Sequence, residues 1–325
     1  MTAKYNNVYV KDTYTISSIY EGLGKINKYF DKIYDKDFYY GMKTFESAES
    51  AMLSDTIDSI IKRNKQIDLI ISGDLQNQIS SSNYAIKDKN IPFLGIYNAC
   101  ATFAEGINIA AKFIEGNMMK NIIVSTSSHN LVAEKQFRNP IEYGAPKKKT
   151  HTFTSTGAAG ILLTNEKTKI KVTSSTIGKI CDAKVKDINN MGAVMALSAA
   201  NTIKTHLNNL HITPEYYDLI LTGDLGIYGK QILTEYLKRE KIDISKNYED
   251  CGLILYDIDK QKVYAGASGP ACSALVTCSY IMEKLKKGEY KKVLIVSTGA
   301  IFSPTRVFQK ETIPSISHAF SLEVE

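Results

Sequence analysis

A cysteine at residue 100 stands where α/β folds present nucleophiles. Cys100 lies within "YNACATFAEG" at 97–106, where the apolar, strand-like run "IPFLGIY" gives way to a helix-like run of small residues. The start of a helix carries partial positive charge, which stabilises a thiolate and lowers the pKa of a thiol. We therefore weigh two interpretations of Cys100: the nucleophile of an acyl-transfer reaction, or one wall of a non-catalytic pocket.

An internal repeat is the strongest pattern in the chain. The segment 99–128 aligns without a gap to 271–300, with Ala-Cys at the beginning, one shared glycine and Ile-Val-Ser-Thr near the end. A second pair precedes it, because "IDLIISGDLQ" at 67–76 matches "YDLILTGDLG" at 217–226. The repeat predicts that one α/β unit occurs twice, with a glycine ending the helix that follows each cysteine.

The repeat also changes how the reactive residues are interpreted. Cys272 is the copy of Cys100, and we expect it to be a buried, inert thiol. Asp74 and Asp224 are likewise equivalent, and a carboxylate kept in both copies is better explained by a turn or helix cap than by acid–base chemistry. A cysteine at a helix start is thus a feature of the repeated α/β unit, so its presence alone does not establish catalysis.

The elements that position these residues alternate between helices and short apolar runs, which predicts an α/β fold with largely parallel strands. The helix after Cys100 is apolar nearly all round and should be buried on every side. Two α/β halves therefore form a layered α-β-α-β-α sandwich with buried central helices. The predicted elements are amphipathic helices at 47–64 and 191–209 and strand–turn–strand units at 156–178 and 251–268; the predicted halves are 1–166 and 167–325.

Composition excludes several classes of protein. No apolar run among the 325 residues reaches the roughly 18 that a membrane helix needs, and the start "MTAKYNNVYVKD" has no apolar signal segment. We expect neither a transmembrane segment nor a signal peptide. The five cysteines form no Cys-x-x-Cys pattern, so we expect no disulfide framework, no metal and no cofactor. The net charge of +6 is scattered, and no nucleic-acid-binding motif accompanies it.

Several long stretches carry a family resemblance over essentially the whole chain. They include "IPFLGIYNACAT", "STSSHNLVAEKQFRNPIEYG", "GASGPACSALVT" and "STGAIFSPTRVFQKETIPSISHA". The duplicated unit resembles the thiolase-like superfamily, and these stretches are similar to the stage V sporulation protein AD (SpoVAD) family. The resemblance implies a thiolase-like fold and a protein that binds dipicolinic acid, with or without calcium, for uptake into the developing spore.

The same resemblance implies where the protein works and with whom. Family members act peripherally at the forespore or spore inner membrane, beside other SpoVA membrane proteins. Members of the superfamily pair as homodimers across a sheet edge, which here is the segment 91–97. No nucleic-acid partner is implied.

The resemblance also implies that the condensing reaction is lost. Condensing enzymes place a histidine after the strand that here reads "DLILT", and the corresponding residue is Gly223. Their second histidine or asparagine corresponds to Ala267. Glycine and alanine supply no proton donor, and losing members of a cooperating catalytic set removes orders of magnitude in rate. We expect no enzyme activity; the alternative is an acyl-CoA-dependent condensing enzyme that uses Cys100 with His129 as base.

A pyridine dicarboxylate is a flat dianion, so its pocket needs cations or N–H donors and an apolar slot. Arg138 suits a carboxylate because its planar fork binds bidentately, but Glu134, one helical turn earlier, would suit it equally as an intramolecular partner. His129 should emerge at the end of a strand, where α/β folds bind ligands, although a purely structural histidine is also consistent. The predicted ligand-binding residues are Cys100, His129, Lys135, Arg138, Tyr143, Gly157, Asp224 and Ser268, with no catalytic and no metal-binding residue among them.

Overall fold

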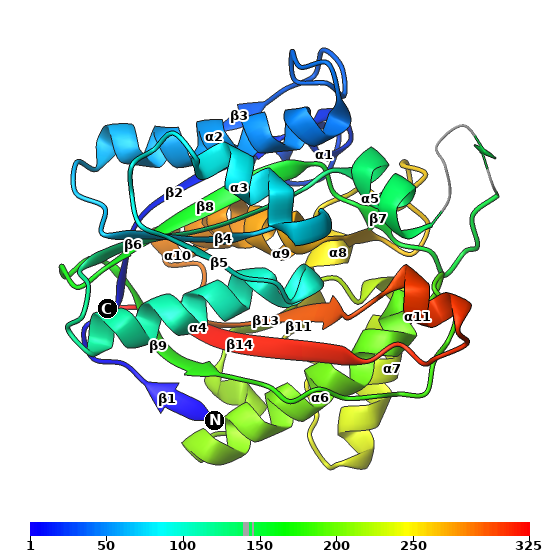
Figure 1. The fold of residues 1–325 in the computed structure, drawn as a ribbon. Coiled ribbons are helices and arrows are strands. Elements are labelled where there is room, and N and C mark those ends of the chain that lie inside the picture. Colours follow the sequence, from blue (N-terminus) through cyan, green and yellow to red (C-terminus); the bar gives the residue numbers. More distant parts are fainter. Residues whose placement is uncertain (139–142, 145) are drawn as a thin grey trace.

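The computed structural model describes residues 1–325 except 139–142 and 145. Five layers follow one another in Figure 1: outer helices, sheet, central helices, sheet and outer helices. The two outer layers are α2 (Phe45–Arg63) with α3 (Ser80–Ile86), and α6 (Met191–Leu210) with α7 (Gly226–Arg239). The predicted helices at 47–64 and 191–209 are confirmed as α2 and α6, and the predicted layered α/β fold is confirmed with them.

The two sheet layers belong to one sheet, joined where β2 pairs with β9, and its strand order shows the duplication. One run of strands is β5-β4-β6-β8-β2, and the other is β11-β10-β13-β14-β9. In each run the first two pairings are parallel and the last two antiparallel. The strands of the first run are β2 (Tyr9–Ser17), β4 (Leu69–Gly73), β5 (Phe93–Gly95), β6 (Asn121–Ser128) and β8 (Gly157–Thr164). Those of the second are β9 (Ile170–Thr176), β10 (Leu219–Thr222), β11 (Tyr248–Asp250), β13 (Lys292–Ala300) and β14 (Ser315–Val324).

Two further strands extend this sheet, β1 (Thr2–Lys4) on β9 and β3 (Lys32–Ile33) on β2. β5 ends its run within the part of the chain that the structure describes. Pairing of two copies along this edge, like the boundary between the halves at 166, stays a prediction.

The central layer holds the two helices that follow the repeated cysteines. They are α4 (Thr102–Glu115) and the continuous helical segment of α9 (Pro270–Val276), a π-helical turn (Thr277–Ile281) and α10 (Met282–Lys287). The predicted glycine stops are confirmed, since Gly116 caps α4 and Gly288 caps α10. Residues of both helical segments form one buried apolar cluster with both runs of strands, and two further clusters lie under the outer helices.

One predicted element is wrong. The expected strand–turn–strand unit over 251–268 is instead the short helix α8 (Cys251–Ile254) and a two-residue strand, β12 (Ala267–Ser268). Asp250 starts this helix, because its carboxylate accepts a hydrogen bond from the Gly252 N–H at 3.0 Å. β12 pairs with β7 (Phe153–Thr154), so this segment joins the two halves instead of closing a sheet. No helix in the described ranges is long and apolar enough to cross a membrane.

Candidate functional site

Cys100 occupies the tight turn between β5 and α4. It is the central residue of the 3₁₀ helix Ala99–Ala101, and Ala99 adopts a left-handed φ of +50°. Such a backbone is strained for a residue with a side chain and needs close packing to hold it. Gly299 provides that packing, because a Cβ there would lie 2.3 Å from the Asn98 carbonyl oxygen. The turn is therefore fixed by the second half of the chain.

The thiol of Cys100 opens on a narrow space that we call the Cys100 cavity, with a volume of about 60 Å³. Ligand pockets are typically several times larger, roughly 300–1,000 Å³. The lining contains no histidine, asparagine or glutamine among the described residues: it consists of Leu75, Tyr97, Ala99, Cys100, Ala133, Phe137, Arg138, Thr154, Met191, Met195, Asp224, Ser268, Gly269, Ala300 and Phe302. Besides the thiol, the titratable groups of this described lining are Asp224, Tyr97 and the guanidinium of Arg138, which stays protonated.

Asp224 is the charged neighbour of the thiol. Its carboxylate accepts a hydrogen bond from the Gly269 N–H at 3.2 Å and another from the Thr298 hydroxyl. Burial raises the pKa of Asp224 to about 7, against the opposing hydrogen bonds from Thr298 and Cys100. Burial, followed by the charge of Asp224, raises the pKa of the Cys100 thiol well above its usual range. The expectation that the helix start lowers this pKa is thus wrong, because desolvation and a neighbouring acid outweigh the helix.

The second copy of the cysteine is enclosed. Cys272 is fully buried, and its thiol donates to the Gly223 carbonyl oxygen at 3.3 Å. Burial raises its pKa well above the usual range, so the thiol stays protonated. Gly223 is closely packed as well, since a Cβ there would lie 3.0 Å from the Thr298 nitrogen. A histidine could not occupy this position without displacing β13.

Arg138 separates the Cys100 cavity from a larger one. It follows the helix α5 (Asn130–Phe137), and its guanidinium donates to Glu134 Oε1 at 2.7 Å. Glu134 also pairs with Lys147 at 2.7 Å and lies 3.2 Å from the His151 ring. Although burial alone would raise it, these partners lower the pKa of Glu134 to about 2. The intramolecular partner considered for Arg138 is therefore present, and the arginine still borders both cavities.

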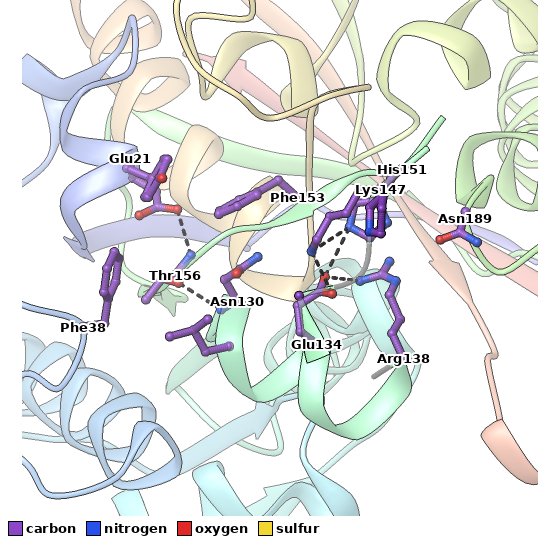
Figure 2. A pocket seen from close by; sticks show the side chains of 14 residues that line it. Glu21, Phe38, Asn130, Glu134, Arg138, Lys147, His151, Phe153, Thr156 and Asn189 are labelled. Carbon is purple, nitrogen blue, oxygen red and sulfur yellow. Dashed lines mark hydrogen bonds and ion pairs between the residues drawn. The ribbon is translucent and has the colours of Figure 1, made fainter. Parts of the chain in front are cut away.

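The larger space, which we call the aromatic cavity, has a volume of about 350 Å³ and is shown in Figure 2. Its described lining comprises Tyr20, Glu21, Phe38, Asn130, Leu131, Glu134, Arg138, Gly144, Pro146, Lys147, His151, Phe153, Thr156 and Asn189. The ring of Tyr20 stacks on Phe38 with centroids 6.2 Å apart and lies 5.1 Å from Phe153. The cavity thus combines an aromatic wall with the cations around Glu134.

Several buried polar atoms in this lining have no hydrogen-bond partner within the described part of the chain. They are Glu21 Oε2, Asn130 Nδ2, Arg138 Nε and His151 Nδ1. An unpaired buried donor or acceptor is unfavourable by about 1–3 kcal/mol, so native proteins keep few of them. Their concentration around one cavity is typical of a site that a polar ligand completes.

The structure gathers only part of the predicted site. Cys100, Arg138, Asp224 and Ser268 line the Cys100 cavity together. Gly157, at the start of β8, allows close backbone approach, because a Cβ would lie 2.5 Å from the Ile16 carbonyl oxygen, yet it lines neither cavity. Tyr143 is exposed and also lines neither cavity.

The two remaining predicted residues are engaged elsewhere. His129 caps α5: one ring nitrogen accepts from the Leu131 N–H at 3.3 Å, and the other lies 2.9 Å from the Phe38 carbonyl oxygen. Burial lowers the pKa of His129 to about 4, so the ring is neutral with both nitrogens occupied. Lys135 forms an ion pair with Glu46 and lies outside the lining of both cavities.

Sequence reasoning missed the residues that complete the aromatic cavity. Glu21 and Phe38 come from a stretch that carries no motif, and only tertiary packing brings them to α5. His151 ends the basic run "PKKKTH", which reads as a solvated loop. The one sequence feature that could have pointed to this cavity is a histidine at the end of a run of lysines.

Comparison with known proteins gives a family and a fold. A model of the stage V sporulation protein AD (SpoVAD) family matches residues 2–323. Stage V sporulation protein AD of Bacillus subtilis (strain 168) is 40% identical over 320 residues, covering 97% of this chain and 94% of that protein. Among solved structures, 3-oxoacyl-[acyl-carrier-protein] synthase III from Aquifex aeolicus VF5 matches with a TM-score of 0.57 at 15% identity, covering 97% of this chain and 99% of that one.

A second solved structure is an OleA variant from Xanthomonas campestris bound with cerulenin. It matches with a TM-score of 0.61 at 14% identity, covering 99% of this chain and 98% of that one. At such identities the likeness to these proteins extends to the fold alone. The thiolase-like fold is therefore established, and function has to be argued from the family and the site.

Proposed function

Because the chain belongs to the stage V sporulation protein AD family, we propose that it binds dipicolinic acid, pyridine-2,6-dicarboxylate, without catalysing acyl transfer. The binding serves uptake of the ligand into the developing spore, at the inner membrane and beside other SpoVA membrane proteins. The observation that carries this proposal is the aromatic cavity, which joins ring-stacking side chains to an arginine inside a volume suited to a small ligand.

The chemistry of the cavity matches the ligand at two points. Tyr20, Phe38 and Phe153 offer ring faces and edges against which a flat pyridine can pack. Arg138 offers a guanidinium whose Nε is unpaired within the described residues, beside the single bond to Glu134. One ligand carboxylate at this guanidinium forms charge-assisted hydrogen bonds, the strongest class in proteins.

The surroundings of Cys100 support a binding role over catalysis. A nucleophilic cysteine reacts as the thiolate, and burial with Asp224 raises the pKa of this thiol. The cavity of about 60 Å³ leaves no room for an acyl chain beside it. Incubation with several acyl-CoA donors should therefore leave the intact mass unchanged; an acyl adduct on Cys100 would refute the non-catalytic role.

Isothermal titration calorimetry with dipicolinate tests the binding. We expect saturable heat from the unmutated protein and a loss of affinity of about 10- to 100-fold in Arg138→Ala, since hydrogen bonds to charged groups contribute about 1.5–3 kcal/mol. Arg239→Ala is the matched control, because Arg239 forms the same kind of pair, one helical turn from Glu235, on the exposed side of α7. Absence of saturable heat with the unmutated protein rules the proposal out.

Two further variants decide which cavity the ligand occupies. Phe38→Ala removes part of the aromatic wall and should weaken binding, whereas Cys100→Ala enlarges only the Cys100 cavity and should leave it unchanged. The opposite pattern would place the ligand against Cys100.

A further inference from the structure

We propose that ligand binding in the aromatic cavity is coupled to the uptake of one proton by Glu21, so that the dianion enters the protein together with a proton. This inference rests on the proposed function and concerns how the same site is regulated. It starts from the two acidic side chains of the cavity, Glu21 and Glu134, which lie on opposite sides of it in Figure 2, with Phe153 between them.

The two carboxyl groups have opposite surroundings. Glu134 is held by Arg138, Lys147 and His151, as described above. Glu21, in the short helix α1 (Ile19–Gly22), is fully buried and forms no ion pair with any described residue. Its Oε1 accepts from the Thr156 N–H at 2.9 Å and from the Tyr256 hydroxyl, while Oε2 has no described partner. Oε2 is therefore the atom that would take up the proton.

The charges of the cavity show why a ligand would favour that proton. Arg138, Lys147 and ionised Glu134 sum to one positive charge, and burial lowers the pKa of His151 so that its ring is neutral. An ionised Glu21 brings the empty cavity to neutrality. A dianion then adds two negative charges that no described cation of the lining balances. Because buried, uncompensated charge is strongly unfavourable, the complex is stabilised when Glu21 becomes neutral.

The neighbouring titratable groups are consistent with this assignment. Tyr256 contacts Glu21 through its hydroxyl, Tyr20 precedes it in α1, and the remaining charged groups that line the cavity belong to the Glu134 cluster. Burial raises the pKa of Glu21 to about 6 despite the hydrogen bonds from Tyr256 and Thr156. In the free protein Glu21 is thus mostly ionised at pH 7. A further rise of its pKa by about one unit in the complex would make it mostly protonated at that pH.

The sign of the pH dependence follows by linkage. Since the complex binds the proton more tightly than the free protein, affinity falls as pH rises above about 6, by up to tenfold per pH unit. The fall ends at the pKa that Glu21 has in the complex. The ligand itself stays doubly ionised over this range, so it does not supply the proton.

Calorimetry at pH 7.0 in phosphate and in Tris measures the proton directly, because the two buffers release it with different heats. We expect the observed enthalpy to rise with the buffer ionisation enthalpy, with a slope of about half to one proton per bound dipicolinate. In Glu21→Gln the slope should fall to near zero, and the affinity should become independent of pH between 6 and 8. Glu166→Gln, on the surface beside Lys11, is the control and should keep the slope.

The possible outcomes distinguish a failure of the proton coupling from a failure of the proposed function. Saturable binding with a slope of zero in the unmutated protein overturns the proton coupling and leaves the proposed function standing. A slope that persists in Glu21→Gln assigns the proton to another group, such as His151, and also overturns it. No saturable heat in either buffer overturns the proposed function and the coupling together. Should Glu21→Gln fail to fold, the affinity of the unmutated protein at pH 6 and pH 8 still decides, because equal affinities contradict the coupling.

Discussion

The same three residues, Gly-Asp-Leu, occur at the end of β4 in the first half, where the glycine is the last residue of the strand, and directly after β10 in the second, but the two aspartates have different partners. Asp74 accepts hydrogen bonds from the Gln76 N–H at 2.8 Å, the Ser82 N–H at 2.8 Å and the Ser82 hydroxyl at 2.7 Å. All its partners lie within eight residues, so it closes a local turn. Asp224 instead bonds Gly269 and Thr298, far along the chain, and adjoins Cys100.

The two aspartates show that the duplicated α/β unit determines the position of a side chain but not its hydrogen-bond partners. In the first half, the donors are Gln76 and, from α3, Ser82. In the second half, Gly269 and Thr298 supply the donors, and the carboxyl group neighbours the cysteine of the other half. One copy is structural and the other lines a cavity.

The largest expected effect compares Asp→Asn in the two copies. An amide at position 74 cannot accept all three hydrogen bonds, and its NH₂ group would face N–H donors. Asp74→Asn should therefore lower the free energy of unfolding by about 2–4 kcal/mol. At position 224 an amide can accept from Gly269 and donate to the Thr298 hydroxyl, so Asp224→Asn should lower it by less than about 1 kcal/mol. Urea unfolding measures both, and equal losses would contradict the distinction.

Above pH 7 the dependence of stability on pH should come mainly from the first copy, because the raised pKa of Asp224 in the second copy is about 7 and that of Glu49 in the first is higher. Burial and the charge of Asp74 raise the pKa of Glu49 from 4.5 to about 8. A raised pKa in the folded state contributes stability that is complete below the unfolded pKa and is lost as pH rises towards 8. We expect the unmutated protein to lose stability between pH 6.5 and pH 8, and Glu49→Gln to be more stable than it at pH 8 by on the order of 2 kcal/mol. Thermal or urea unfolding at both pH values measures this. If the stability of the unmutated protein and of Glu49→Gln changed equally with pH, the assignment to Glu49 would be excluded.

The smallest effect concerns the second copy. Asp224→Asn removes a charge that raises the pKa of the Cys100 thiol, so alkylation of Cys100 by iodoacetamide at pH 8 should quicken about tenfold. Cys272 should stay unlabelled because it is fully buried. Asp74→Asn serves as the control and should leave the Cys100 rate as it is. Labelling sites are read by peptide mass spectrometry, and an unchanged rate in Asp224→Asn would show that the two carboxyl groups do not differ in this respect.

Sequence patterns predicted the parts of the fold that depend on local periodicity. The gap-free alignment of 99–128 with 271–300 identified both central helices and the strands after them. The run "CGLILY" misled, because a short apolar stretch looks the same in a buried helix as in a strand. In the structure Asp250, the last residue of β11, caps a short helix there.

The site was less predictable, because its members come from segments that no local pattern connects. Cys100, Asp224 and Ser268 follow strand ends or precede helices, and their convergence follows from the topology. Glu21 reaches the same region from α1 through its hydrogen bonds with Thr156 and Tyr256, which are distant in sequence. For His129 the sequence could place the residue at the end of a strand, but not show that a helix N-terminus and a carbonyl occupy both ring nitrogens.

Arg138 lines both cavities, and this position links the Cys100 thiol electrostatically to the aromatic cavity. The positive charge of the guanidinium lowers the pKa of the thiol, against the larger effects of burial and Asp224. An anion that settles on the aromatic side neutralises that charge without touching the sulfur. Under the proposed function, the chemical reactivity of Cys100 would therefore change when a ligand occupies a cavity that the cysteine does not line.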